Sequence, residues 1–276
     1  MMRRSRIVLY AVAWLIGLFW VLPFLGVFVS SIRPYSEVVD GWWRLDHFTL
    51  TLDAFIQAFN HPTAPLGPAL LNSVSIAVPA TILTIVFASL AAYAFARFKF
   101  RLKSTLFFVV ILIMAMPGQS IIIPLFAYMR DLGLVDTRLG LILVHTAWGI
   151  PWAVLFLRNF FLSVPLDLEE SARVYGASDL KIFTRIVLPI ALPAIVSIAV
   201  LQFVWVWNDF LFALILLTSP DKKVVTQTIP LLKGRFDIPW SLLSAASVLS
   251  MIVPLLIFVF LQKYYVKGVL AGAIKG

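Results

Sequence analysis

Long apolar runs separated by short polar segments dominate this 276-residue chain. Each run holds about 20 or more mostly apolar residues, enough to cross roughly 30 Å of hydrocarbon as a helix. Strands of a membrane barrel would be about 9–11 residues long with alternating polarity, which the runs do not show. The pattern predicts an all-α polytopic membrane protein that forms a single transmembrane domain over residues 1–276. The six expected spans are Ile7–Ile32, Leu70–Ala96, Ser104–Met129, Leu139–Phe161, Ile190–Thr218 and Ser241–Gln262.

Composition agrees with this picture and excludes several kinds of chemistry. The chain is 62% hydrophobic and 13% charged, whereas soluble proteins are about 25% charged. It contains no Cys, which excludes disulfides, thiolate nucleophiles and zinc–thiolate sites. The net charge of +9 could indicate nucleic-acid binding, but basic residues that flank spans in a lipid bilayer explain it better. We therefore expect neither a nucleic-acid partner nor a cofactor.

The distribution of basic residues predicts the orientation in the membrane. Fourteen of the 22 Lys and Arg fall on one side of the expected spans, and the positive-inside rule assigns that side to the cytoplasm. Both termini are then cytoplasmic, and the 33–69 and 219–240 loops face outward. The cytoplasmic group comprises Arg3, Arg4, Arg6, Arg97, Lys99, Arg101, Lys103, Arg158, Arg173, Lys181, Arg185, Lys263, Lys267 and Lys275.

Two features near the amino terminus each allow two interpretations. The opening "MMRRSR" could begin a signal peptide, but the apolar run after it exceeds the 7–15 residues typical of a signal core. We therefore expect an uncleaved first span. The aromatic residues of the outward 33–69 loop either anchor the chain at the interface or form a docking surface for an extracytoplasmic partner. They are Trp42, Trp43, Phe48, Phe55 and Phe59.

A polar, Gly-containing stretch, 165–189, separates the fourth and fifth spans. Asp167 and Glu170 have the spacing of a capping box, which predicts a helix from Leu168. Gly176 is a natural left-handed stop, and Ser178 is placed to cap a second helix. An ordinary interfacial helix is the alternative, but the first helix has too few large apolar residues for one.

Small residues on the first helix indicate a docking face. Ala172 and Gly176 lie four residues apart and therefore share one face, which permits close approach by another surface. Glu170 and Arg173 lie beside that face. The arrangement is suited to docking into a groove on a partner.

The same stretch carries a family resemblance. The pattern "EAA – – – G – – – – – – – – – I – LP" is matched by Glu170, Ser171, Ala172, Gly176, Ile186, Leu188 and Pro189. With this motif the chain resembles binding-protein-dependent ABC importer permeases. "MPGQSIIIPLFAYMRDLGLVDT", "WNDFLFAL" and "AGAIKG" are similar to the maltose-type permeases of the carbohydrate-uptake branch. Ser171 replaces the usual Ala, and Tyr175 stands where such permeases usually carry Asp.

The resemblance implies a multi-pass subunit of a prokaryotic cytoplasmic membrane that works in a complex. It would pair with a second homologous permease, with two ATPase subunits below and a substrate-binding protein outside, and import a sugar. The chain contains no G-x-x-x-x-G-K-[ST] phosphate loop, so we expect ATP hydrolysis on a partner and no enzymatic activity here. The residues expected to couple the ATPase to the spans are Glu169, Glu170, Ser171, Ala172, Arg173, Gly176 and Ala177.

The fifth span contains the candidate substrate pathway. Asp209 is an acid well inside the expected span, where a charge costs about 2.5–3.5 kcal/mol on insertion scales. Gln202 and Trp205 share its helix face, and Asn208 is adjacent. Carboxylate and amide groups suit sugar hydroxyls, and indole suits the apolar ring face. The alternative is that Asn208 and Asp209 cap the span and hold it against its neighbours.

Other signals favour packing or exclude further classes. Pro117, Gly118 and Pro124 interrupt the third span, and a kink there either opens a pathway or aids packing. His145 is a lone histidine, for which core packing is expected. An ion-coupled secondary transporter is the alternative class, but we find no clear inverted repeat. An intramembrane enzyme lacks support, because no H-E-x-x-H motif or convincing Ser/His pair is present.

Overall fold

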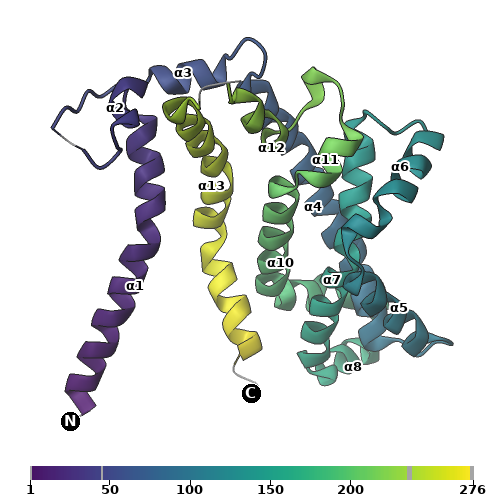
Figure 1. Ribbon diagram of the computed structural model, residues 1–276. Coiled ribbons are helices and arrows are strands. Elements are labelled where there is room, and N and C mark those ends of the chain that lie inside the picture. Colours follow the sequence, from purple (N-terminus) through teal and green to yellow (C-terminus); the bar gives the residue numbers. More distant parts are fainter. Residues whose placement is uncertain (1, 45, 235–237, 274–276) are drawn as a thin grey trace. The chain divides into compact units, whose positions relative to one another are not determined.

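A computed structural model describes the backbone of residues 2–44, 46–234 and 238–273, and the side chains of these ranges from residue 8 to residue 263. Every regular element in these ranges is a helix or a helical turn (Figure 1). Part of the charge tally and the whole "AGAIKG" motif lie outside the described side chains. They are Arg3, Arg4, Arg6, Arg235, Lys267, Lys275 and residues 271–276.

Long apolar helices confirm the predicted membrane fold. Five described helices are long and apolar enough to cross a membrane, and a bent pair would make a sixth span. The helix that ends at Asn208 begins earlier than expected, because α9 (Asp179–Ile182) and a π-helical turn, η2 (Phe183–Val187), lead directly into it. The principal helices are α1 (Met2–Ser31), α4 (Leu66–Arg97), α7 (Arg138–Ser163), α10 (Leu188–Asn208) and α13 (Trp240–Ala273).

The chain divides into two compact units, which are described separately. Unit 1 holds Met1–Leu70 and Gln227–Val253, and unit 2 holds Leu71–Thr226 and Pro254–Gly276. The three boundaries fall within α4, α12 (Val225–Thr228) and α13. The single domain expected over residues 1–276 stays a prediction.

A buried cation organises the polar segment of unit 1. The Arg33 side chain is only 1% exposed, and it donates to Glu37 at 3.0 Å and to the carbonyl of His47 at 2.6 Å. Hydrogen bonds from Thr49, followed by those of Arg33, lower the pKa of Glu37. The segment after α1 therefore folds around the Arg33 guanidinium, which contacts the short helix α2 (Tyr35–Val39) and the loop after it. A second short helix, α3 (Asp53–Phe59), follows that loop.

Aromatic residues of this segment, which the charge bias predicts to face outward, are only partly packed. Trp42 lies against Gly26, where an added Cβ would come within 3.0 Å of the indole. The Phe59 ring covers Gly67 in the same way. Trp43 stays exposed, so both the anchoring and the docking interpretations remain open.

The expected third span is not one continuous helix. α5 (Lys103–Ala115) ends before Pro117, and a 3₁₀ turn, η1 (Gly118–Ile121), leads into α6 (Ile122–Asp131). The two halves are bent by 97° at this break. The predicted interruption at Pro117 and Gly118 is thus confirmed. Pro124 breaks nothing, because it lies in the first turn of α6, where backbone N–H groups have no intrahelical partner.

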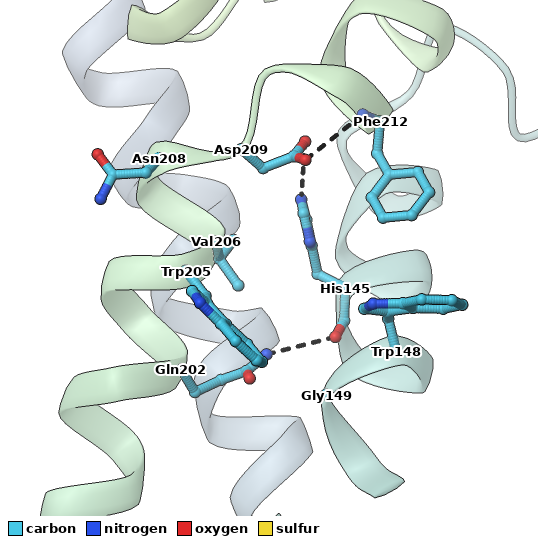
Figure 2. A pocket seen from close by; sticks show the side chains of 9 residues that line it. All are labelled: His145, Trp148, Gly149, Gln202, Trp205, Val206, Asn208, Asp209 and Phe212. Carbon is cyan, nitrogen blue, oxygen red and sulfur yellow. Dashed lines mark hydrogen bonds and ion pairs between the residues drawn. The ribbon is translucent and has the colours of Figure 1, made fainter. Parts of the chain in front are cut away.

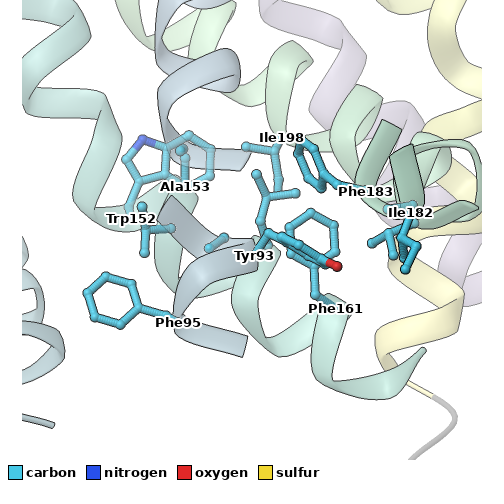
Figure 3. Packing of buried hydrophobic residues seen from close by; sticks show 14 residues of the cluster. Tyr93, Phe95, Trp152, Ala153, Phe161, Ile182, Phe183 and Ile198 are labelled. Atoms are coloured by element: carbon cyan, nitrogen blue, oxygen red, sulfur yellow. The ribbon is translucent and has the colours of Figure 1, made fainter. Parts of the chain in front are cut away.

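An aromatic cluster forms the core of unit 2 (Figure 3). The ring of Tyr93 on α4 lies 4.8 Å from that of Phe183 and 6.3 Å from that of Phe161 on α7. Ile182 beside them is fully buried. Burying a side chain of this size contributes about 1.5–3 kcal/mol. The cluster fixes α4, α7 and the start of the α10 helix around the polar stretch that follows α7.

Candidate functional site

The candidate substrate site is a pocket between α7 and the end of α10 (Figure 2). Its volume is about 300 Å³. All four candidate pathway residues border it. The lining residues are His145, Trp148, Gly149, Gln202, Trp205, Val206, Asn208, Asp209 and Phe212.

Gln202 is bonded to neighbouring helices and is not free for a ligand. Its side chain is 2% exposed. The amide oxygen accepts from Trp152 Nε1 at 2.9 Å, and the amide nitrogen donates to the carbonyl of His145 at 3.3 Å and to Thr84 Oγ1 at 3.4 Å. Gly149 permits this approach, because an added Cβ would overlap the Gln202 amide. Gln202 therefore joins α4, α7 and α10 and forms the closed floor of the pocket.

Asp209 lies at a break in the chain, which corrects the expectation of an acid inside a continuous span. α10 ends at Asn208, and a separate short helix, α11 (Leu211–Leu216), follows. The Asp209 carboxylate accepts from the backbone N–H of Ala213 at 3.1 Å and of Phe212 at 3.5 Å. The carboxylate therefore caps the first turn of α11, and not the span that ends at Asn208, and it also lines the pocket.

His145 is not the isolated histidine expected from the sequence. Its Nε2 atom lies 3.6 Å from Asp209 Oδ2, just beyond hydrogen-bond length (Figure 2). Nε2 is buried and has no hydrogen-bond partner among the described residues. The Phe212 ring packs edge-on against the imidazole at 5.9 Å. His145 and Asp209 together place polar groups at the end of the pocket beside Phe212.

Indole and phenyl rings form the remaining wall. Trp205 is exposed and packs edge-on against Trp152 with ring centroids 5.3 Å apart. Trp148 packs against Phe212 at 5.9 Å. Asn208 is exposed, and its side chain points away from His145 (Figure 2). Of the four candidates, Trp205 and Asp209 are the ones with groups directed at the pocket space.

The break between α5 and α6 lies beside this pocket. A Cβ added at Gly118 would lie 3.4 Å from the Phe212 ring and 3.5 Å from the Trp148 ring. These are ordinary packing distances, so the backbone of the break rests on two rings of the pocket wall. The interruption of the third span therefore supports the wall of the site.

The candidate coupling element is α8 (Leu166–Val174), at the carboxyl end of α7 (Figure 1). It begins two residues earlier than expected, after Pro165, and no side chain caps it. The predicted capping box of Asp167 and Glu170 is therefore wrong: Asp167 lies inside the helix, where it cannot serve as the N-cap residue. Pro165 starts the helix instead, with its fixed backbone angle.

The end of α8 follows the prediction. Gly176 has a φ of +79°, in the left-handed region that favours glycine. The N–H of Gly176 donates to the Arg173 carbonyl at 2.9 Å, and that of Ala177 donates to the Ala172 carbonyl at 3.0 Å. This is the Schellman pattern. Ser178 then caps α9 by accepting from the N–H of Lys181, as expected.

Glu169 lies inside the protein and not on the docking face. Its side chain is 0% exposed, and its carboxylate accepts from Arg97 Nε at 2.6 Å and from the Tyr93 hydroxyl at 3.1 Å. Arg97 also donates to the Val164 carbonyl at 2.9 Å. A buried ion pair with additional hydrogen bonds holds its two chain segments in one geometry. Glu169 thus fastens α8 to the end of α4.

The exposed part of α8 differs from the small-residue face expected. Ala172 and Ala177 pack against the aromatic core cluster and not outward. Glu170 and Ser171 are exposed, and Val174 and Tyr175 are 85% and 89% exposed. Large apolar side chains this open on a short helix are typical of a contact surface for another protein. Arg173 braces the turn by pairing with Asp179 at 3.0 Å.

Several residues that complete these sites were hard to predict from the sequence. Trp148 lies three residues after His145, and Phe212 lies three residues after Asp209, so helical spacing was the available signal. Tyr93 and Arg97 lie 76 and 72 positions from Glu169. Nothing local to the sequence pairs residues so far apart.

A comparison with protein families identifies the class of this membrane protein. Residues 84–270 match the family described as "Binding-protein-dependent transport system inner membrane component". The match covers more than half of the chain and includes both candidate sites. The chain belongs to this family and is a multi-pass permease of the ABC importer type.

Individual relatives agree with that assignment. The chain is 48% identical to a probable ABC transporter permease protein of Pyrococcus horikoshii over 99% of both chains. It is 44% identical to the osmoprotective compounds uptake permease protein GgtD of Synechocystis (94% of this chain, 89% of the relative). It is 34% identical to the trehalose/maltose transport system permease protein MalG of Thermococcus litoralis (99% and 98%).

Solved structures show the same fold. One chain of a bacterial ABC transporter involved in the import of the acidic polysaccharide alginate matches with a TM-score of 0.79 and 25% identity. The match covers 95% of this chain and 98% of that chain. The relatives are permease subunits and not enzymes, and they do not favour the ion-coupled alternative.

Proposed function

We propose that this chain is half of the translocation pathway of a sugar importer that is driven by ATP hydrolysis on partner subunits. A second homologous permease would supply the other half, an ATPase pair would dock at α8, and an extracytoplasmic binding protein would deliver the substrate. The family description, with its binding-protein-dependent transport, supports the last partner. The absence of a phosphate loop from the sequence supports a separate ATPase.

The observation that carries the proposal is the construction of α8. Its outer side presents Tyr175 and Val174, while its inner side is fastened to α4 through Glu169 and Arg97. A force applied by a docked partner would therefore reach a long apolar helix through a rigid connection. Switching between discrete packings of such rigid bodies is how alternating access operates.

The pocket at the other end of α7 supports a sugar as the substrate. His145 lies 18 residues before Ser163, or about 27 Å along the helix axis. The pocket combines the indole of Trp205 with the Asp209 carboxylate and His145, a mixture that suits a ring with an apolar face and hydroxyl edges. The trehalose/maltose permease MalG is a relative of this chain, whereas GgtD is named for osmoprotective compounds. We therefore assign the substrate to the class of small polyhydroxylated solutes.

Glu170→Lys and Gly176→Trp test the docking face. Glu170 is exposed on α8, and a side chain at Gly176 would force a positive φ on a residue that disfavours it. We expect each variant to insert normally and to lose most of the captured ATPase, with uptake falling at least tenfold. Pull-down of the ATPase subunits with the tagged permease measures this.

Asp131→Lys is the matched control. It makes the same charge reversal at an exposed acid, but at the end of α6, away from α8. Capture of the ATPase should stay at the wild-type level in this control. Wild-type capture in both α8 variants would show that the ATPase docks elsewhere.

A further inference from the structure

A second cavity of unit 2 lies at the same end of α7 as α8. Its volume is about 280 Å³, and it is bordered by the end of α4, the first half of α5 and Arg158 on α7. Arg158 follows His145 by 13 residues, about 20 Å along the helix axis. The cavity is therefore separate from the candidate substrate pocket.

The half-buried Arg158 lacks the carboxylate partner that Arg33 and Arg97 possess in the part of the chain that the structure describes. Its Nε atom is buried and has no hydrogen-bond acceptor among the described residues. The guanidinium lies over the Phe107 ring at 4.2 Å, a cation–π contact that supplies no acceptor. Arg33 and Arg97, by contrast, each pair with a carboxylate and a backbone carbonyl. A buried, unsatisfied donor is costly, so the cavity calls for an acceptor from outside this chain.

The remaining lining specifies an anionic group joined to an apolar tail. Lys103 and the Ser104 hydroxyl border the cavity, and none of its lining residues is acidic. Phe95, Phe107 and Phe108 provide apolar walls. Lys103 donates to a backbone carbonyl, that of Phe98, at 2.9 Å, so its charge is not neutralised there.

α5 continues this apolar surface away from the cavity. None of its side chains, all of which the structure describes, is buried. Phe108 and Leu112, one helical turn apart, are both exposed. An acyl chain could therefore lie along α5 from a headgroup held at Arg158.

We propose that this cavity binds the phosphate of an anionic phospholipid. Arg158 and Lys103 hold the phosphate oxygens, Ser104 donates a further hydrogen bond, and the acyl chains lie on α5. Basic pockets between transmembrane helices on the cytoplasmic side are suited to such headgroups. The assignment to the cytoplasmic leaflet rests on the proposed function, because it takes the α8 end as the ATPase side.

Lipid retention by the purified permease complex tests the proposal. The complex is exchanged into nanodiscs of phosphatidylcholine with a minor fraction of phosphatidylglycerol, and co-purifying lipid is measured by native mass spectrometry. We expect the wild type to enrich phosphatidylglycerol and Arg158→Gln to lose that enrichment about tenfold, the value of a hydrogen bond to a charged group. Lys103→Gln should lose part of it, and Arg158→Lys should retain part of it.

Lys99→Gln is the matched control. Lys99 is an exposed basic residue between α4 and α5, four positions before Lys103, and it does not line the cavity. It should enrich the lipid normally. Equal enrichment in wild type and Arg158→Gln would overturn the proposal, as would no enrichment in the assembled complex, which would assign Arg158 to a partner subunit. Displacement of the lipid by millimolar inorganic phosphate would assign the site to a free anion instead. ATPase capture through α8 is scored on the same samples, so a failure of the proposed function is seen separately.

Discussion

At the scale of single residues, Asp209 combines two tasks that the sequence presented as alternatives. Its carboxylate accepts from two backbone N–H groups of α11 and also lies 3.6 Å from His145 in the pocket wall. Asp209 itself is held in place by the chain around it, because the Thr226 hydroxyl donates to its carbonyl at 2.6 Å. Capping and contact with substrate are therefore compatible.

Asp209→Asn separates the two tasks. The amide keeps one oxygen for the N–H groups of α11 but removes the negative charge from the pocket. We expect the yield of the assembled complex to be unchanged and sugar uptake to fall by roughly ten- to a hundred-fold, because a hydrogen bond to a charged group is worth about 1.5–3 kcal/mol. Uptake into proteoliposomes and complex yield are measured on the same preparation.

Asp209→Ala removes the cap as well, and should lower stability by about 1 kcal/mol, as the loss of a helix cap does. Asp131→Asn, at an exposed acid on α6, is the control for charge alone. Normal uptake and normal assembly in Asp209→Asn would show that the carboxylate is merely solvated in a wide cavity.

At the scale of elements, the Arg97–Glu169 ion pair connects α8 to α4, and we propose that motion passes through unit 2 by this connection. Removing one partner of a buried ion pair typically costs about 3–5 kcal/mol. Glu169→Gln should therefore lower the melting temperature of the complex and reduce the sugar transported per ATP hydrolysed. Exchanging the two charges, Arg97→Glu with Glu169→Arg, should recover part of both quantities.

Two further variants separate coupling from general stability. Tyr93→Phe removes one hydrogen bond to the Glu169 carboxylate, worth about 1.5–3 kcal/mol, and leaves the ion pair in place. Asp179→Asn breaks the exposed pair with Arg173, which is worth at most about 1 kcal/mol. A wild-type ratio of sugar to ATP in Glu169→Gln, despite its lower melting temperature, would mean that the pair only stabilises the fold.

At the scale of the whole molecule, the charge bias predicts which ends of the helices face the cytoplasm. The chain has no Cys, so a single introduced thiol reports one position without background. We expect Gln57→Cys, on the exposed surface of α3, to react with an impermeant maleimide in intact cells. Ser163→Cys, at the exposed carboxyl end of α7, should react only after the cells are opened. The opposite pattern would reverse the orientation and with it the side on which an ATPase could dock.

Some of this protein follows from the sequence alone. Runs of about 20 apolar residues can only be membrane helices or a hydrophobic core, which established the all-α membrane fold. Gly176 and Ser178 ended one short helix and began the next as expected, because both act through their own backbone and nearest neighbours. The spacing from Glu170 to Pro189 indicated the family for the same reason: it is a local pattern.

Only the tertiary structure decided which polar groups are available to a ligand or a partner. Glu169 and Glu170 are neighbours of the same chemistry, yet one is buried against Arg97 and the other is exposed. Gln202 looked like a sugar ligand by helical spacing, but its amide bonds to α4 and α7. His145 lies 3.6 Å from the Asp209 carboxylate, a neighbour 64 positions along the chain, because α10 ends at Asn208. Local propensity determines where helices begin and end. The burial and pairing of polar side chains such as Glu169 and Gln202 depend instead on segments 50 or more residues away in the sequence, and no local pattern encodes those contacts.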